Sequence, residues 1–261
     1  DMGDRLKKAG KWLVSRQYAN GAWASFDQLH IWSISWTVSV YKQYACTPEE
    51  KQLLEAAAEW LEKGQNADGS YGSTPPFTCP DLDDTAVALI ALQGFPGMET
   101  SRTAGLLKRL QNKDGSWSTF PSYEGEPPNV QSVCPVYIPS QDVTIHVLEG
   151  LLGERGYERE FFRGLQWLLS QQLPSGEFPA VWFEGPIYST AQAVELLGKI
   201  RFDEEHEQLA GQTLDACQKA VGFLLSQQNT DGSWGNSIIE TSLTLTALCN
   251  EKYKVPEVTL V

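Results

Sequence analysis

Three carboxylic acids stand within four positions at the start of an apolar stretch. They are Asp81, Asp83 and Asp84, and the residues from Val87 to Leu92 that follow them are aliphatic. On a helix, Asp81 and Asp84 lie near one face with Asp83 close beside them. Carboxylates crowded in this way cannot all ionise cheaply, so at least one should retain its proton. The run therefore predicts a group that can act as a general acid.

The same run also fits an ordinary helix start. Asp is a favoured N-cap residue, and acids in the first turn are stabilised by the positive end of the helix dipole. One Asp suffices for a cap, and three exceed that need. From this run alone, capping and acid chemistry are equally good interpretations, so the rest of the chain must decide.

Composition and charge narrow the classes of partner. The net charge of −13 argues against nucleic acid, since phosphate neutralisation needs clustered Lys and Arg, and an uncharged or cationic ligand fits better. No run approaches the ~20 apolar residues of a membrane span, and the charged N-terminus lacks a signal-peptide apolar region. We expect one large domain over residues 1–261, cytoplasmic, and either soluble or peripheral to a membrane.

The cysteines are odd in number and scattered, with no CxxC pair. Neither a disulfide framework nor a zinc knuckle is indicated, and a reducing compartment is the default. The five are Cys46, Cys79, Cys134, Cys217 and Cys249.

One short pattern recurs five times along the chain at a period of roughly fifty residues. A Gln is followed four positions later by Gly and six positions later by an aromatic residue, and three copies contain Asp-Gly-Ser as a turn signal. The copies are Gln17/Gly21/Trp23, Gln65/Gly69/Tyr71, Gln111/Gly115/Trp117, Gln172/Gly176/Phe178 and Gln228/Gly232/Trp234.

Each copy follows an amphipathic helix and precedes a more apolar one, so the sequence predicts helix pairs with inner and outer members. An all-α fold follows, an α/α barrel or toroid of antiparallel pairs. In each turn the aromatic residue packs on the neighbouring pair, and the Gln binds helix-end backbone groups. The second helices are expected to start near Ile34, Asp84, Asp142, Ser189 and Glu240.

The inner helices all begin after the turns, so their first residues should ring one cavity mouth. Two longer connections rich in Pro and Ser, residues 72–80 and 118–141, reach the same end and are candidate cavity walls.

Together, these features resemble the squalene-hopene cyclases and related class II terpene cyclases. The repeats and the Asp-x-Asp-Asp-Thr-Ala run match that family. Residues 141–149 look like its Asp-Val-Thr-x-His-Val-Leu-Glu segment, and residues 188–190 look like its Tyr-Gly-Thr motif after a Trp. The resemblance extends roughly from residue 21 to residue 248.

The resemblance implies that this domain protonates a linear isoprenoid olefin and directs ring closure through carbocations. It assigns Asp83 as the proton donor, Asp81 and Asp84 as its charged neighbours, and His146 as the group that orients the acid. Asp142 belongs to the supporting polar network. A cationic His beside the acid stabilises the carboxylate that proton transfer leaves. The mechanism requires no metal ion or other cofactor.

Carbocations need an electron-rich, nonbasic lining, which aromatic faces supply by cation–π attraction. Trp32, Trp182 and Tyr188 are the lining candidates that the resemblance suggests. The family carries an aromatic-rich stretch between the second repeat and the acid run, where this chain retains Phe77 alone, so squalene itself transfers less well than the reaction type.

Two further departures concern the architecture. Family members have a second α-barrel domain, which this sequence does not show, and their catalytic domain closes with six helix pairs, where five can be counted here. The domain is therefore expected either to lack a final pair or to close differently, and peripheral membrane contact, a dimer or a second barrel domain are the partners considered.

Two rivals remain. A protein prenyltransferase β-subunit shares the helical toroid and holds zinc with Asp, Cys and His, which Cys79, Asp81 and His146 could imitate, although its Asp-x-Cys order is reversed here. A noncatalytic toroid that binds an isoprenoid or a partner chain is the other, since an incomplete ring exposes apolar surface.

Overall fold

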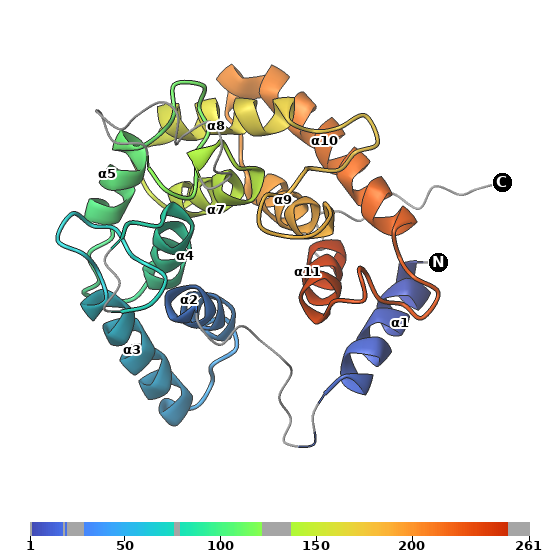
Figure 1. Ribbon diagram of the computed structural model, residues 1–261, viewed down its shortest axis with the longest axis horizontal. Coiled ribbons are helices and arrows are strands. Elements are labelled where there is room, and N and C mark those ends of the chain that lie inside the picture. The colour runs from blue at the N-terminus through green and yellow to red at the C-terminus, as the bar shows by residue number, and fades with distance from the viewer. Residues whose placement is uncertain (1, 18, 20–28, 76–78, 122–136, 250–261) are drawn as a thin grey trace. The chain divides into compact units, whose positions relative to one another are not determined.

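The computed structural model describes residues 2–17, 19, 29–75, 79–121 and 137–249. Within these ranges the chain is helical, with ten α-helices, a short 3-10 helix and no strand (Figure 1). The sole β-type pairing in these ranges is an isolated bridge between Tyr71 and Asp81. None of these helices is long and apolar enough to cross a membrane.

The chain forms two compact units. The middle unit comprises residues 26–168, and the terminal unit combines residues 1–25 with residues 169–261. The predicted single domain over 1–261 and its missing final pair stay predictions.

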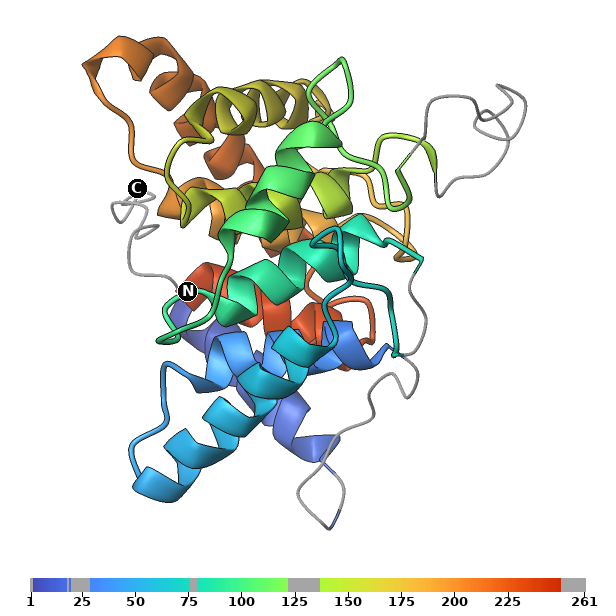
Figure 2. The ribbon, with the colours of Figure 1, turned by 90° about the vertical axis from the view of Figure 1, so that its left-hand side faces the viewer.

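In the middle unit the more apolar helices lie side by side, with α4 between α2 and α7. The outer helices α3 and α5 pack against α4, and Figure 2 views this layer from outside with α3 (blue) and α5 (green) in front. The helices are α2 (His30–Tyr41), α3 (Pro48–Lys63), α4 (Leu82–Leu92), α5 (Ser101–Arg109), α7 (Gln141–Leu152) and most of α8 (Glu158–Ser170).

The inner and outer helices differ as the sequence predicted. Every residue of α4 from Asp84 to Leu92 is buried, because this helix is apolar all round. In α3, by contrast, burial is confined to Leu54, Ala58 and Leu61, one stripe at helical spacing. A capping box between Thr47 and Glu50 begins α3.

The terminal unit repeats this arrangement. Here α9 (Ile187–Lys199) packs beside α11 (Ile238–Cys249), α10 (Glu207–Ser226) packs on α9, and α1 (Met2–Ser15) packs on α11. A 3-10 turn, η2 (Glu204–His206), precedes α10.

In three repeats the Gln fastens its turn to backbone groups of the next outer helix, as predicted, and in the second repeat Gln65 Nε2 donates instead to Thr103 Oγ1 of α5 at 2.8 Å. Gln111 Nε2 donates to the carbonyl oxygen of Gly115 at 2.8 Å and to that of Glu160 in α8 at 2.8 Å. Gln172 bonds in the same way to Gly176 and to Ala216 in α10. These bonds cross from one helix pair to the next, so the repeats supply stability.

The aromatic residue of each described turn is fully buried, and a threonine holds its backbone. The N–H of Trp117 donates to Thr144 Oγ1 at 3.0 Å, and three other inner helices place a Thr in the same way. Each Thr stands four residues after the N-cap position. The pairs are Tyr71/Thr85, Trp117/Thr144, Phe178/Thr190 and Trp234/Thr241. Gly21 and Trp23 of the first repeat lie outside the described residues.

The last turn fastens onto the first helix. Gln228 Nε2 donates to the carbonyl oxygen of Arg5 in α1 at 3.1 Å, and Arg5 Nη1 donates to the Leu225 carbonyl oxygen at 2.7 Å. Relative to this turn, α1 therefore occupies the place that α8 and α10 occupy relative to the preceding two turns.

Candidate active site

The acid run forms the N-terminus of α4. Asp81 is the N-cap, and its Oδ1 accepts the backbone N–H groups of Asp83 at 2.9 Å and Asp84 at 3.3 Å. The N–H of Asp81 itself donates to the Tyr71 carbonyl oxygen at 2.9 Å. Asp81 therefore caps the helix, and this leaves Asp83 and Asp84 of the same run for acid chemistry, the alternative that the sequence left open.

Asp83 is paired with His146 of the neighbouring helix α7. A hydrogen bond joins Asp83 Oδ1 to His146 Nδ1. The Asp83 side chain is 18% exposed, whereas that of His146 is 1% exposed. The imidazole is therefore enclosed behind a carboxyl group that can still be reached.

Burial sets the ionisation of the two flanking acids. It raises the pKa of Asp84 to about 9, with the charges of Asp81 and Asp83 adding to the effect. Burial and the Asp83 charge raise the pKa of Asp81 to about 7, against the two N–H groups that it accepts. Asp84 thus keeps its proton at pH 7 and donates it to the Asp81 carboxylate. The run thus retains a proton, but on Asp84, which the resemblance implied to be a charged neighbour of Asp83.

His146 is driven toward its charged form. Burial acts to lower its pKa, but the charge of Asp83 and the hydrogen bond to it, aided by the charges of Asp142 and Glu149, raise the pKa above its ordinary value. The surroundings of His146 therefore favour its imidazolium form beside the Asp83 carboxyl group.

Asp142 lies in the first turn of α7 and is 2% exposed. Ser140, the N-cap of that helix, donates its Oγ–H to Asp142 Oδ1. Asp83 and Asp142 both stand two residues after their N-cap, and Tyr188 stands at the same position in α9. Three of the predicted site residues therefore occupy the same position relative to the start of their inner helix.

The predicted lining residues have different surroundings. Trp32 is half-buried in the first turn of α2, and its backbone N–H donates to the Asp84 carboxyl group. In the terminal unit, Trp182 is 48% exposed, and Tyr188 is buried and stacked on Phe183 with ring centroids 3.5 Å apart. Phe77 lies outside the described residues. The lining roles of these four residues stay predictions.

Trp36 was not among the residues singled out from the sequence. Its ring centroid is 5.3 Å from that of His146, with an interplanar angle of 70°, and 6.2 Å from that of Trp32. The spacing of Trp32 and Trp36, four residues apart on one helix face, was the signal available. The abundance of aromatic residues in this chain concealed it.

The geometry does not assemble the zinc set of the prenyltransferase rival. Over the described ranges, no three His, Cys, Asp or Glu side chains come together closely enough to hold a metal ion. Cys79 is an exposed free thiol. Asp203 and His206 form another hydrogen-bonded acid and His pair, which lies at the surface at the start of the short helix η2.

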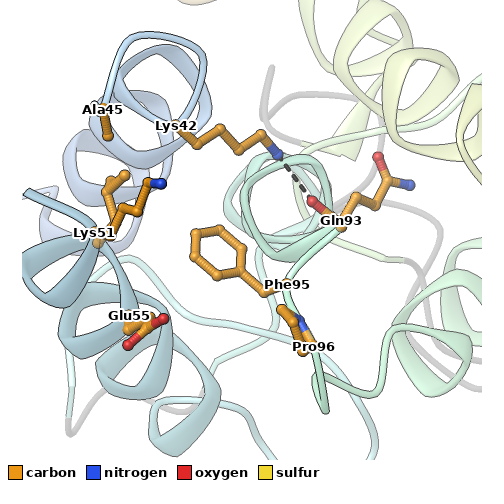
Figure 3. A pocket seen from close by; sticks show the side chains of 9 residues that line it. Lys42, Ala45, Lys51, Glu55, Gln93, Phe95 and Pro96 are labelled. Atoms are coloured by element: carbon orange, nitrogen blue, oxygen red, sulfur yellow. Dashed lines mark hydrogen bonds between the residues drawn. The ribbon is translucent and has the colours of Figure 1, made fainter. Parts of the chain in front are cut away.

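A separate hollow of about 420 Å³ opens at the other end of α4 (Figure 3). Lys42 Nζ donates there to the carbonyl oxygens of Ile90, Ala91 and Gln93 at 2.9, 3.2 and 3.0 Å. This ammonium caps the helix C-terminus. Asp83 begins the same eleven-residue helix, about 15 Å away by helix geometry, so the hollow is not part of the acid site.

Two family models match the chain. The squalene-hopene cyclase C-terminal domain matches residues 76–248, and the prenyltransferase alpha-alpha toroid domain matches residues 5–138. Together these matches cover the acid run, His146 and all the described repeats.

Individual relatives point the same way. A copalyl diphosphate synthase of Streptomyces anulatus is 30% identical over 190 residues, which are 70% of this chain and 30% of the relative. A probable squalene–hopene cyclase of Sinorhizobium fredii is 26% identical over 215 residues, 74% of this chain and 31% of the relative. The chain thus spans about a third of the length of these relatives.

A solved structure supports the fold. The ent-copalyl diphosphate synthase from Streptomyces platensis is similar with a TM-score of 0.64 and 22% identity, over 88% of this chain and 41% of that one. The predicted α/α barrel is therefore confirmed. The chain belongs to the family of the squalene-hopene cyclase C-terminal domain and has its α/α toroid fold.

Proposed function

We propose that this chain is the catalytic domain of a class II terpene cyclase, in which Asp83 is the general acid toward a linear isoprenoid olefin. The observation that carries the proposal is the hydrogen bond between Asp83 and the buried His146, beside two carboxyl groups of raised pKa. Relatives named as copalyl diphosphate synthase and squalene–hopene cyclase support the reaction class.

The proposed step begins with Asp83 protonated on the carboxyl oxygen that does not face His146. The olefin's π electrons take this proton to form a C–H bond, which leaves a carbocation on the neighbouring carbon and a carboxylate on Asp83. Internal double bonds then attack the cation in turn and close the rings. Loss of a proton or capture of water ends the sequence, and solvent returns the proton to Asp83.

Protonating an olefin needs a strong acid, which favours Asp83 over its neighbours. An acid is stronger when its conjugate base is stabilised, and His146 supplies a hydrogen bond and a positive charge to the Asp83 carboxylate. Asp84 is 3% exposed and its pKa is raised, so it is enclosed and weakly acidic. Because Asp84 is neutral at pH 7, the new carboxylate meets less negative charge.

The substrate is an extended isoprenoid, and Trp32, Trp182, Tyr188 and Phe77 keep the proposed role of lining its cation. An apolar substrate partitions into membranes, so peripheral membrane contact in the cytoplasm is part of the proposal. So is a second barrel domain or a second copy of the chain, because this chain spans about a third of its relatives' length.

The test incubates the protein with squalene, farnesyl diphosphate and geranylgeranyl diphosphate. Extracts are analysed by gas chromatography and mass spectrometry after phosphate removal, alongside Asp83→Asn. Asp203→Asn is the matched control, because it alters an exposed Asp–His pair outside the acid run. We expect a cyclic product from one substrate, lost in Asp83→Asn and kept in Asp203→Asn. Folded protein that forms no product with any substrate would favour the noncatalytic binding domain.

A further inference from the structure

The aromatic ring of Trp36 lies beside the imidazole ring of His146. Trp36 lies in α2, His146 in α7, and their ring centroids are 5.3 Å apart. This is within the ~6 Å over which a cation and an aromatic ring attract each other. His146 is 1% exposed, so water contributes little to the solvation of its charge.

The charged groups acting on His146 come from two helices. Asp83 acts from α4, and Asp142 and Glu149 act from α7 itself. From α2, Lys42 interacts with the charge of Glu149, but its ammonium is held by three carbonyl oxygens at the far end of α4. Trp36 thus meets the imidazole from α2 with an uncharged ring.

We propose that Trp36 is a positioning residue for the proposed protonation: its ring packs on His146, favours the imidazolium form and holds it against Asp83. This inference rests on the proposed function for its catalytic consequence, but the contact can be tested without turnover. An edge-to-face arrangement is one that aromatic pairs prefer, and an indole ring at this distance attracts a positive charge.

The first experiment follows the titration of His146 by NMR of ring-labelled histidine. The chain has three histidines, and His30→Gln with His206→Gln leaves His146 as the reporter. In this background, Trp36→Leu removes the ring and Trp36→Phe keeps a smaller one. Trp60→Leu is the matched control, because Trp60 is 39% exposed on the outer helix α3.

We expect Trp36→Leu to lower the pH at which His146 titrates by about one unit, since a desolvated cation–π contact is of that size. Trp36→Phe should shift it by less than half as much, and Trp60→Leu should leave it unchanged. An unchanged or higher titration pH in a folded Trp36→Leu protein would overturn the proposal. Trp36→Phe keeps the test decisive if Trp36→Leu fails to fold.

The second experiment measures turnover against pH with the substrate found active above. Activity needs both the Asp83 proton and the His146 imidazolium, so kcat falls as pH rises and this hydrogen-bonded pair loses its protons. This alkaline limb should move to lower pH by about one unit in Trp36→Leu, with KM within twofold of the parent protein. A limb that does not move would contradict the positioning role. The two experiments can also disagree. If Trp36→Leu shifts the titration of His146 but the parent protein cyclises no substrate, the proposed function fails, while the effect of Trp36 on His146 is still supported.

Discussion

Gln228 Nε2 donates a hydrogen bond to the backbone oxygen of Arg5, 3.1 Å away and 223 positions earlier in the sequence. The same amide nitrogen also donates to the Gly232 carbonyl oxygen at 3.0 Å. One side chain therefore closes its own turn and binds that turn to the first helix of the chain.

Replacing Gln228 should destabilise the terminal unit. Gln228→Leu removes both bonds and leaves two carbonyl oxygens with fewer donors, at a cost of about 2 kcal/mol in the free energy of unfolding. Gln227→Leu is the control, because the side chain of that exposed neighbour has one hydrogen bond among the described contacts, to Ser226 Oγ. Urea unfolding followed by circular dichroism measures both, and equal stability of the two variants would refute the fastening role.

The threonine of the inner helix should matter through its hydroxyl group. Thr144→Val keeps the shape of the side chain but leaves the buried N–H of Trp117 without its acceptor, so we expect a loss of about 1–3 kcal/mol. Thr144→Ser retains the hydroxyl and should lose less. Thermal unfolding of the two variants compares them, and a Val variant as stable as the Ser variant would contradict the account.

Two glycines should respond in opposite ways to a methyl group. Gly115 has φ +103°, and a Cβ there would lie 2.6 Å from the Arg163 carbonyl oxygen, so Gly115→Ala should destabilise the middle unit strongly. Gly222 lies inside α10 with nothing within 4 Å of its Cβ position. Gly222→Ala should therefore stabilise the fold by about 0.5–1 kcal/mol. Calorimetry of the two variants measures whether each is less stable or more stable than the parent protein.

Stability should fall as pH rises from about 4 to 9. The pKa of Asp81 is raised to about 7 and that of Asp84 to about 9 in the folded chain, so the folded state binds more protons than the unfolded state over this window. Their contribution is fully present below the unfolded-state pKa and is lost as pH rises through the folded-state values. His146, whose pKa is also raised, acts with the same sign.

Asp84→Asn removes the largest of these carboxyl contributions and should flatten the pH dependence of stability. Asp215→Asn, on the exposed face of α10, is the control and should leave the slope unchanged. Urea unfolding at pH 5.5, 7 and 8.5 measures the slopes. A slope in Asp84→Asn as steep as in the parent protein would show that Asp84 does not titrate in this range.

Much of the fold could be predicted from the sequence, because each repeat marks both a turn and the contact of that turn with the next helix pair. The Gln, Gly and aromatic positions predicted turns, and the Gln bonds follow from their spacing. The resemblance brought Asp83 and His146 together, although they are 63 positions apart, because the helices that carry them are neighbours in the repeat order.

Other features depend on side-chain packing that periodicity does not encode. The bond from Trp117 to Thr144 crosses a connection of 26 residues, so sequence spacing gave no sign of it. Tyr188 was predicted from its motif to line a cavity, and in the structure it is buried with its ring stacked on Phe183. The ionisation of Asp84 depends on how deeply its carboxyl group is buried, and a sequence pattern does not show that depth.

The threonine four positions after each N-cap has a consequence for how such a domain can change over evolution. Its bond fixes the start of the inner helix without using the two residues immediately before it, which vary among the described pairs. They are Asp83-Asp84, Asp142-Val143, Tyr188-Ser189 and Ile239-Glu240. The two residues can therefore differ from one inner helix to the next, and with them the chemistry at the helix start, while the bond between each turn and its own inner helix stays the same.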